Sequence, residues 1–424
     1  MKVTVGPCSH SGQPVRIPGS KSISHRTLIA AALSKEPAVI SGLVENNDTE
    51  ATIRCLKQLG ASFVHNDDGT LTVTGIGDCF HYDGNPVDCG ESGSTLRFLI
   101  PIFSLCGQKV IFTGHGKLMQ RPQTVYEELF RSQSLLFKQD ADILTIQGPL
   151  HAGHFHIPGN ISSQFISGLL FALPLLNEDS VLEILEPYES GSYVGLTEDI
   201  LEQAGIRFID EGNRITIFGR QTYHCPSLTV DGDDSQAAFF AGLALTGRLP
   251  VTVQGMRHES RQGDHVIVEL IERAGGHSIP MENGFCFEPD QYHGFNADLA
   301  DCPDLGPILF ALAAGAEGTS TFYHCGRLRI KESDRIEAMK EELSKLGIRL
   351  IEQGETVSIE GNPVIEGGVE LDGHNDHRIV MALAVLAVKA KRPVIINGAE
   401  AVRKSYPAFF DDLKTAGAEV TYGD

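Results

Sequence analysis

The chain has 424 residues and a formal net charge of −21, with 55 Asp and Glu residues against 34 Lys and Arg residues. A surface this acidic repels the phosphates of nucleic acids and anionic lipids, so neither nucleic acid nor membrane is expected as a partner. No apolar stretch approaches the roughly 18 residues that a membrane span needs, and the polar N-terminus is unlike a signal peptide, which predicts a cytoplasmic protein.

Cysteine and histidine spacing gives no sign of a metal or of a disulfide framework. The nine cysteines form no CxxC pair, which indicates reduced thiols. The 16 histidines show no HExxH or similar ligand spacing. We therefore expect no structural metal.

A polar cluster followed by an apolar run recurs six times, at intervals of 70 to 72 residues. The six segments are Ser22–Leu33, Ser92–Leu105, Ser162–Leu175, Asp234–Leu245, Asp304–Ala314 and Asp376–Val388. A helix that is apolar nearly all round is buried, and a fixed period indicates repeated structural units. The sequence therefore predicts six repeats, each with one buried helix that starts with a polar N-cap.

Each repeat continues in a similar way. A short strand ending in Gly follows the apolar run, as in Lys109–Gly114. An amphipathic helix comes next, such as Thr49–Leu59, which stops at Gly60. Two alternating strands then close the repeat, as in Arg207–Ile209 with Arg214–Ile217. The repeat is thus predicted to be β-α-β-α-β-β.

Six such repeats make two α/β domains of three repeats each. The division falls between the third and fourth repeats, near Thr229–Asp233. The first strand, Lys2–Val5, precedes the first helix and can complete the later domain. We expect one domain of residues 1–18 plus 231–424, which holds both termini and repeats 4 to 6, and an inserted domain of residues 19–230.

Three of the helix starts carry a cation or an amide beyond what a cap requires. They are Pro18–Arg26 (PGSKSISHR), Gly90–Arg97 (GESGSTLR) and Ser162–Gln164 (SSQ). Free N–H groups and a partial positive charge at a helix N-terminus favour anions, and small residues let a ligand approach the backbone. For a single helix, a plain N-cap is the commoner explanation. Several such starts together predict a multiply anionic ligand.

Four further polar segments are Arg121-Pro122, Arg329–Arg335, Asn375–Arg378 and Arg403–Pro407. An isolated Arg-Pro is typical of a surface loop, and a charge run such as RIKESDR is typical of a solvated helix face. Four polar residues at a buried helix start, however, are costly unless they have partners. Cations recur through the seven segments, among them Lys21, Arg26, Arg97, Arg121, Lys331, Arg335, Arg378 and Lys404. With the carboxylates Asp304 and Glu332, they predict a site for two anions and a proton transfer.

These segments together resemble the EPSP synthase (3-phosphoshikimate 1-carboxyvinyltransferase) family of enolpyruvyl transferases. The motifs PGSKSxSxR, SGSTxR, RP, SSQF, RxKESDR, NDHR and KxxP follow in the family's order between Gly19 and Pro407. The resemblance implies the two-domain enolpyruvyl transferase-like fold, an inside-out α/β barrel with the active site in the interdomain cleft. It also implies transfer of the enolpyruvyl group of phosphoenolpyruvate to shikimate 3-phosphate, in chorismate and aromatic amino acid biosynthesis, with no cofactor. A monomer is expected.

The resemblance assigns substrates to residues one by one. The shikimate 3-phosphate positions are Lys21, Ser22, Arg26, Ser162, Ser163, Gln164, Ser190, Tyr193, Asp304 and Lys331. The phosphoenolpyruvate positions are Lys21, Gly93, Arg121, Gln164, Arg335, His377, Arg378 and Lys404.

By the same resemblance, the catalytic residues are Lys21, Asp304 and Glu332. Glu332 is the expected acid toward the methylene carbon of phosphoenolpyruvate, since a carboxylic acid in a dry site can keep its proton. Asp304 is the expected base toward the 5-hydroxyl of shikimate 3-phosphate, with Lys21 as the alternative.

Three positions depart from the family pattern. They are Glu91 and Arg327, where other members have Asn, and the SGSY segment at Ser190–Tyr193. The nearest alternative enzyme is UDP-N-acetylglucosamine enolpyruvyl transferase, but that family carries a Cys in the loop before its Arg-Pro, and Gly114–Gln120 has none. A non-catalytic anion-binding protein of the same fold is the other alternative, and the Asp304 and Glu332 pair argues against it.

Overall fold

The computed structural model describes residues 1–8, 10, 12–77, 79–140 and 142–423. The chain divides into two compact units. We call residues 1–18 with 231–424 the terminal unit and residues 19–230 the inserted unit. Within the described residues, no helix has both the length and the apolar character to cross a membrane.

The inserted unit holds three β-α-β-α-β-β repeats. Its helices are α1 (Lys21–Leu33), α2 (Asn47–Gln58), α3 (Gly93–Ser104), α4 (Thr124–Ser132), α5 (Ser163–Ala172) and α6 (Gly191–Gln203), with short 3-10 turns η1 (Leu118–Gln120) and η2 (Leu173–Leu175). Its strands are β3 (Ala38–Ser41), β4 (Ser62–His65), β5 (Leu71–Thr74), β6 (Val87–Asp88), β7 (Lys109–Thr113), β8 (Leu136–Gln139), β9 (Ile143–Gln147), β10 (His154–Pro158), β11 (Ser180–Leu185), β12 (Phe208–Asp210), β13 (Arg214–Ile217) and β14 (Ser227–Thr229).

The terminal unit holds the other three repeats. Its helices are α7 (Asp234–Gly247), α8 (Ile267–Arg273), α9 (Gly306–Gly315), α10 (Arg335–Lys345), α11 (His377–Ala387) and α12 (Phe409–Thr415), with 3-10 turns η3 (Gly263–Val266), η4 (Pro303–Leu305), η5 (Gly326–Ile330) and η6 (Ala399–Lys404). Its strands are β1 (Lys2–Cys8), β2 (Val15–Arg16), β15 (Val251–Gln254), β16 (Gly276–Met281), β17 (Gly284–Pro289), β18 (Asn296–Asp298), β19 (Gly318–Tyr323), β20 (Arg349–Gln353), β21 (Thr356–Gly361), β22 (Glu370–Asp372), β23 (Val394–Asn397) and β24 (Ala418–Gly423).

Every repeat contributes a four-stranded sheet. In the second repeat the order is β6-β7-β9-β8, with β6 and β7 parallel and the other neighbours antiparallel. Three sheets borrow a strand from elsewhere in their unit. β14 joins β3, β2 joins β15, and β1 lies between β23 and β24. The N-terminal strand thus pairs within the last sheet of the terminal unit.

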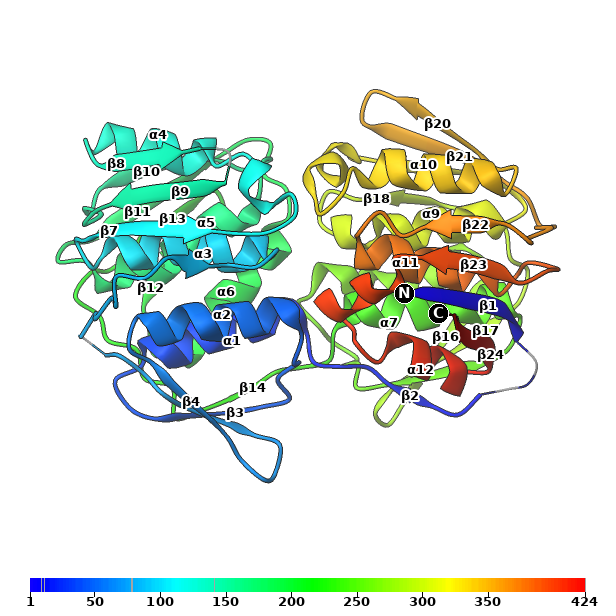
Figure 1. Ribbon diagram of the computed structural model, residues 1–424, viewed down its shortest axis with the longest axis horizontal. Helices are drawn as coiled ribbons and strands as arrows, with labels where there is room; N and C mark the ends of the chain where they lie inside the picture. The colour runs from blue at the N-terminus through cyan, green and yellow to red at the C-terminus, as the bar shows by residue number, and fades with distance from the viewer. Residues whose placement is uncertain (9, 11, 78, 141, 424) are drawn as a thin grey trace. The chain divides into compact units, whose positions relative to one another are not determined.

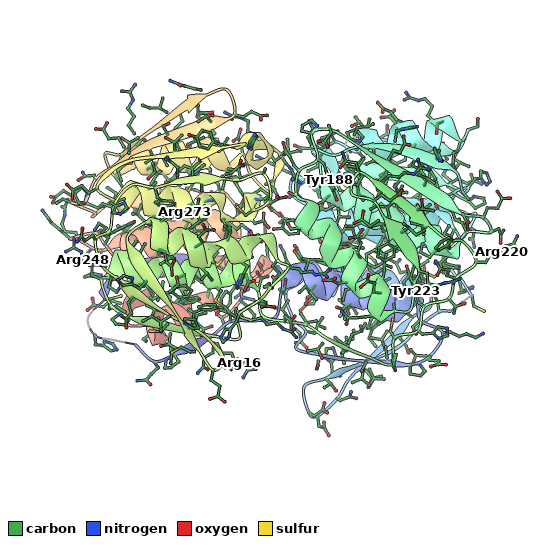
Figure 2. The ribbon with its side chains drawn as sticks, turned by 180° about the vertical axis from the view of Figure 1, so that it is seen from behind. Arg16, Tyr188, Arg220, Tyr223, Arg248 and Arg273 are labelled. Atoms are coloured by element: carbon green, nitrogen blue, oxygen red, sulfur yellow. The ribbon has the colours of Figure 1, made fainter. Side chains whose placement is uncertain are left out.

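The first helix of each repeat lies in the core, as its composition predicts. All ten residues of α9 are buried, and so are eleven of the thirteen residues of α1. In the terminal unit α7, α9 and α11 pack against one another, and Figure 1 shows them within the sheets. In the inserted unit α3 packs on α5, while α1 packs on α2 and α6. Tyr223, labelled in Figure 2, is buried here and donates its hydroxyl to the Phe171 carbonyl at 2.8 Å.

Polar residues begin most of these helices. Ser20 caps α1, Ser92 caps α3, and Ser162 caps α5 through its hydroxyl. The fifth repeat differs from the prediction, because α9 begins at Gly306 and its N-cap, Leu305, makes no side-chain bond. Asp304 lies before it in η4, and its carboxylate is bound by cations from other segments. Asp304 is therefore not a helix cap.

Candidate active site

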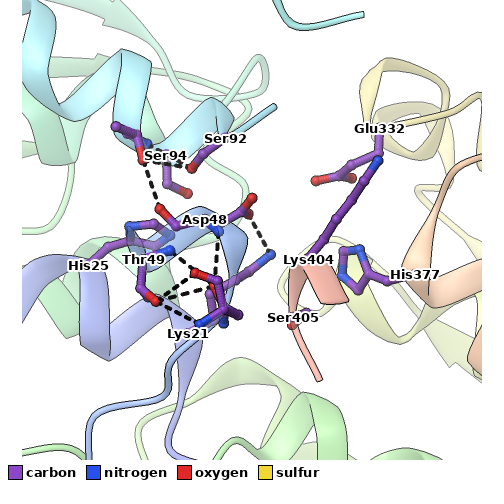
Figure 3. A network of polar contacts seen from close by, with 12 residues as sticks. Lys21, His25, Asp48, Thr49, Ser92, Ser94, Glu332, His377, Lys404 and Ser405 are labelled. Carbon is purple, nitrogen blue, oxygen red and sulfur yellow. Dashed lines mark hydrogen bonds and ion pairs between the residues drawn. The ribbon is translucent and has the colours of Figure 1, made fainter. Parts of the chain in front are cut away.

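In the inserted unit the first polar helix start presents a lysine. Lys21 is the first residue of α1, and its Nζ donates to Oδ2 of Asp48 at 3.2 Å (Figure 3). Asp48 lies in the first turn of α2, behind the Asn46 cap. The two side chains are only 12% and 11% exposed, so this ion pair is largely desolvated. Such a pair fixes the ammonium more firmly than a surface pair would.

Arg26 lies deeper, one turn along α1. Its Nε donates to the Thr197 hydroxyl at 2.7 Å, its Nη1 to the Ser22 carbonyl at 2.7 Å, and its Nη2 to the Tyr193 carbonyl at 2.7 Å. Burial lowers the pKa of Arg26 to about 9. Arg26 thus ties α1 to α6, and it orders the Tyr193 backbone. Ser190, at the start of α6, is fully buried with a left-handed φ of 56°.

A second network connects α3 with α5. Arg97 is buried over the Phe165 ring, and its Nη1 donates to Oε1 of Gln164 at 2.9 Å and to the Ser162 hydroxyl at 3.3 Å. Gln164 in turn donates from Nε2 to the Ser94 hydroxyl at 2.9 Å. These bonds fix the orientation of the Gln164 amide and of the Ser162 hydroxyl. Ser163, beside them, is buried at the start of α5.

Gly93 opens α3 at a point where a side chain would collide with Arg121 unless that arginine moved. A Cβ there would lie 2.7 Å from Nη1 of Arg121, well inside contact distance, and 3.6 Å from Oε1 of Gln164. The absence of a side chain therefore lets the Arg121 guanidinium lie against the helix start. The Arg-Pro segment belongs to this polar group and is not a plain surface loop.

The terminal unit holds a carboxylate contacted by three cations. Oδ1 of Asp304 accepts from Arg335 Nη1 at 3.0 Å and from Lys331 Nζ at 3.2 Å. Oδ2 accepts from Arg378 Nη2 at 2.9 Å. Asp304 is 17% exposed, so these charges are partly removed from water.

Arg335, the first residue of α10, connects three carboxylates while only 1% exposed. Besides Asp304, it contacts Glu332 Oε2 from Nη2 at 2.8 Å and Asp376 Oδ2 from Nε at 2.9 Å. Burial alone would lower the pKa of Arg335, but Asp376, Glu332 and Asp304 raise it. Burial alone would raise the pKa of Asp376, but Arg335 lowers it overall. Both groups are therefore ionised at neutral pH.

The remaining predicted residues of this unit surround the same group. Arg378 in α11 donates to the Ser235 hydroxyl at 3.0 Å, and Lys404 Nζ donates to the Asn375 carbonyl at 2.7 Å. Figure 3 shows Lys404 extended beside Glu332 and His377. Burial lowers the pKa of Lys331 to about 8, although the neighbouring Asp304 carboxylate opposes that shift. The unit thus gathers four cations and three carboxylates, a set suited to anion binding and proton transfer.

Comparison with known proteins identifies the family. The model of the EPSP synthase (3-phosphoshikimate 1-carboxyvinyltransferase) family matches residues 9–413. The chain belongs to the EPSP synthase family.

Relatives and solved structures agree with that assignment. A 3-phosphoshikimate 1-carboxyvinyltransferase of Clostridium kluyveri is 40% identical over 99% of this chain and 98% of its own, and one of Clostridium acetobutylicum is 41% identical over the same shares. An EPSP synthase structure from Acinetobacter baumannii superposes with a TM-score of 0.81, at 25% identity, over 99% of this chain and 100% of that one. The enolpyruvyl transferase NikO of Streptomyces tendae, at 15% identity and TM-score 0.77 over 99% and 98%, shares the fold. The predicted family and fold are confirmed.

The structure groups the family-assigned residues of each unit, and it adds partners that the sequence did not assign. Asp48, Thr197 and Asp376 each hold a predicted cation, at Lys21, Arg26 and Arg335 respectively. The NDHR motif contains Asp376, so the sequence could have indicated this residue as a partner. The only sequence feature that marks Asp48 is its place in a polar helix start, and no sequence feature marks Thr197.

Proposed function

We propose that this chain transfers the enolpyruvyl group of phosphoenolpyruvate to the 5-hydroxyl of shikimate 3-phosphate, giving 5-enolpyruvylshikimate 3-phosphate and phosphate. The observation that carries it is the group around Asp304, which combines Lys331, Arg335 and Arg378 with a second carboxylate, Glu332. A binding protein for anions would need the cations but not two half-buried carboxylates among them.

The reaction runs by addition and elimination. The 5-oxygen of shikimate 3-phosphate forms a bond to C2 of phosphoenolpyruvate, its proton goes to Asp304, and C3 takes a proton from Glu332. The tetrahedral adduct then loses phosphate from C2, and the Glu332 carboxylate takes a proton from C3, which restores the double bond. The departing phosphate takes the proton held by Asp304, so both carboxyl groups return to their starting states. We assign the proton of Glu332 to Oε1, since Oε2 accepts from Arg335 at 2.8 Å.

The cations divide between the two anions. Arg335, Arg378, Lys404 and Arg121 are assigned to phosphoenolpyruvate, where they stabilise the departing phosphate. The residues assigned to shikimate 3-phosphate are Ser22, Arg26, Ser162, Ser163, Gln164, Ser190, Tyr193, Asp304 and Lys331. Lys21 is assigned to both substrates, and His377 to the phosphoenolpyruvate side.

The assay that tests the proposal measures phosphate release from phosphoenolpyruvate with two acceptors in parallel. We expect release with shikimate 3-phosphate and none with UDP-N-acetylglucosamine. Release with the nucleotide sugar alone would reassign the acceptor. Release with neither acceptor, from protein shown to be folded by circular dichroism, would favour an anion-binding protein.

Replacing Gly93 with Ala should weaken phosphoenolpyruvate binding selectively. The new Cβ would meet Nη1 of Arg121 at 2.7 Å, so the guanidinium must move. We expect KM for phosphoenolpyruvate to rise about tenfold, because one displaced charge-assisted contact is worth roughly 1.5 kcal/mol. KM for shikimate 3-phosphate should change less than twofold. Gly195→Ala in α6, where no atom lies within 4 Å of the Cβ, is the matched control. An equal rise in both KM values would contradict the assignment of Arg121.

A further inference from the structure

A buried carboxylate with no assigned role lies near the other end of α10. Glu342 has a fully buried side chain, and both its oxygens accept from Lys345 Nζ at 2.8 Å. Oε2 also accepts from the Asp372 backbone N–H at 2.9 Å, and Oε1 from His374 Nε2 at 2.8 Å. A buried carboxylate is costly unless it is paired and hydrogen-bonded. Glu342 meets both conditions by joining α10 to the segment that follows β22.

That segment has an unusual backbone. His374 and Asn375 are consecutive non-glycine residues with φ of 50° and 53°. Left-handed conformations are unfavourable for non-glycine residues and persist only where the surroundings enforce them. Here several hydrogen bonds enforce the conformation. The Asp372 N–H and the His374 ring donate to Glu342. The His374 backbone N–H donates to Asp372 Oδ1 at 2.6 Å, and the Asp376 N–H donates to the Gly373 carbonyl at 2.8 Å.

The left-handed turn ends at two groups of the proposed site. The Asn375 carbonyl accepts from Lys404 Nζ at 2.7 Å. Asp376 follows directly, caps α11, and accepts from Arg335 Nε at 2.9 Å and from the Ser333 hydroxyl at 3.0 Å. The conformation of His374 and Asn375 therefore sets where the Lys404 ammonium and the Asp376 carboxylate lie.

We propose that Glu342 is a positioning residue for phosphoenolpyruvate binding. Through Asp372 and His374 it holds the left-handed turn that directs the Asn375 carbonyl to Lys404 and Asp376 to Arg335. Glu342 itself touches neither substrate in this account. The inference rests on the proposed function, because Lys404 and Arg335 are assigned to phosphoenolpyruvate there.

A metal site is the competing explanation for the same residues. Within the described residues, Glu341, Glu342 and His374 form the one group of three whose possible ligand atoms lie within 4.8 Å of one another. The Lys345 ammonium already bridges both oxygens of Glu342, so a cation would have to displace it. EDTA treatment of the purified protein should leave its activity unchanged, and activity lost to EDTA and restored by added zinc would favour the metal site.

The test compares Glu342→Gln with Glu341→Gln. The first substitution would place an amide NH₂ where a carboxylate oxygen now accepts two donors, whereas Glu341 is exposed and lies 3.5 Å from the same lysine. For Glu342→Gln we expect KM for phosphoenolpyruvate to rise about tenfold, since small displacements of binding groups have effects of this order. KM for shikimate 3-phosphate should stay within twofold, and Glu341→Gln should match the wild type in both.

A second readout follows the turn itself. The hydrogen bond that His374 donates to Glu342 raises the pKa of His374 against the effect of burial, and the charges of Asp372 and Glu341 raise it further. Lys345 contacts the same Glu342 carboxylate. NMR titration of the His374 ring should therefore give a clearly lower pKa in Glu342→Gln and a much smaller decrease in Glu341→Gln, because Glu341 acts on the ring only through its charge. His374→Asn, which tolerates the left-handed backbone but loses the imidazole, should raise KM for phosphoenolpyruvate by a smaller factor. If Glu342→Gln does not fold, His374→Asn serves as the test variant instead.

The outcomes separate the inference from the function. An active wild type whose Glu342→Gln variant keeps its KM for phosphoenolpyruvate would overturn the positioning role alone. Equal rises in both KM values would also overturn it, because they indicate a general loss of structure. A wild type inactive with shikimate 3-phosphate would refute the proposed function, and the inference with it.

Discussion

Replacing Asp304 with Asn is expected to lower kcat for phosphate release by about 10³-fold, because a positioned general base contributes roughly 10²–10⁴. The amide keeps the size of the side chain and can still accept one hydrogen bond from Arg335 or Arg378. It cannot take the proton of the attacking hydroxyl. The loss of a negative charge among Lys331, Arg335 and Arg378 should leave KM for phosphoenolpyruvate no higher than in the wild type.

Comparison with Lys21→Met decides between the two candidate bases. Lys21 donates to Asp48 in the inserted unit, so its loss should weaken binding and raise KM. Single-turnover rates at saturating substrates isolate the chemical step, which should be slow in Asp304→Asn and nearer normal in Lys21→Met. Asp298, at the end of β18, is an exposed acid that pairs with His324 at 2.7 Å. The variant Asp298→Asn therefore controls for the change of charge. If Asp304→Asn keeps more than a tenth of the wild-type rate while Lys21→Met does not, Lys21 is the base.

The repeats could be predicted because buried helices carry their signal locally. A run that is apolar all round, with a polar cap before it, indicates a core helix without any knowledge of its neighbours. The predicted run Ser22–Leu33 therefore differs from α1 by one residue at its start, and Ser92–Leu105 differs from α3 by one residue at each end. Where long-range contacts compete, the local signal misleads. Asp304 reads as a helix cap, but Arg335 and Arg378 bind it from 31 and 74 residues away.

The same contrast between local signals and long-range contacts applies to the residues of the site. Residue types and motifs predicted the cations, because ligand-binding groups must be of particular chemical kinds. Their partners depended on the fold. Arg26 is bound by Thr197 and the Tyr193 carbonyl, 171 and 167 residues along the chain, and no local pattern indicates those contacts. The hydrogen bond that His374 donates to Glu342 could not be predicted either, since a Glu in the last turn of an amphipathic helix is usually solvated.

Replacing Asp376 with Asn should destabilise the terminal unit by about 3 kcal/mol, because it leaves the buried Arg335 without one of its partners. The Asn side chain can still cap α11 by accepting the Arg378 N–H, which Asp376 accepts at 2.9 Å. The loss therefore reports the ion pair rather than the cap. Since the chain has no tryptophan, urea unfolding is best followed by circular dichroism.

Asp334→Asn is the matched control for that change. Asp334 also caps a helix, α10, and also pairs with an arginine, Arg329 at 2.7 Å, but these side chains are 38% and 42% exposed. An exposed pair contributes less than about 1 kcal/mol, so this variant should stay close to the wild type. Equal losses in the two variants would show that burial of Arg335 and Asp376 does not determine the effect.

The pH dependence gives an independent check of the Asp376 pair. Arg335 holds the pKa of Asp376 below its usual value in the folded chain, despite the opposing effect of burial. The ion pair thus stabilises the fold above the unfolded pKa of about 3.9, and its contribution is lost as the pH falls through the lower folded value. The difference in unfolding free energy between wild type and Asp376→Asn should be full at pH 7 and shrink below about pH 4. A difference that stays constant to pH 3 would assign the loss to packing around the new amide, not to the charge on Asp376.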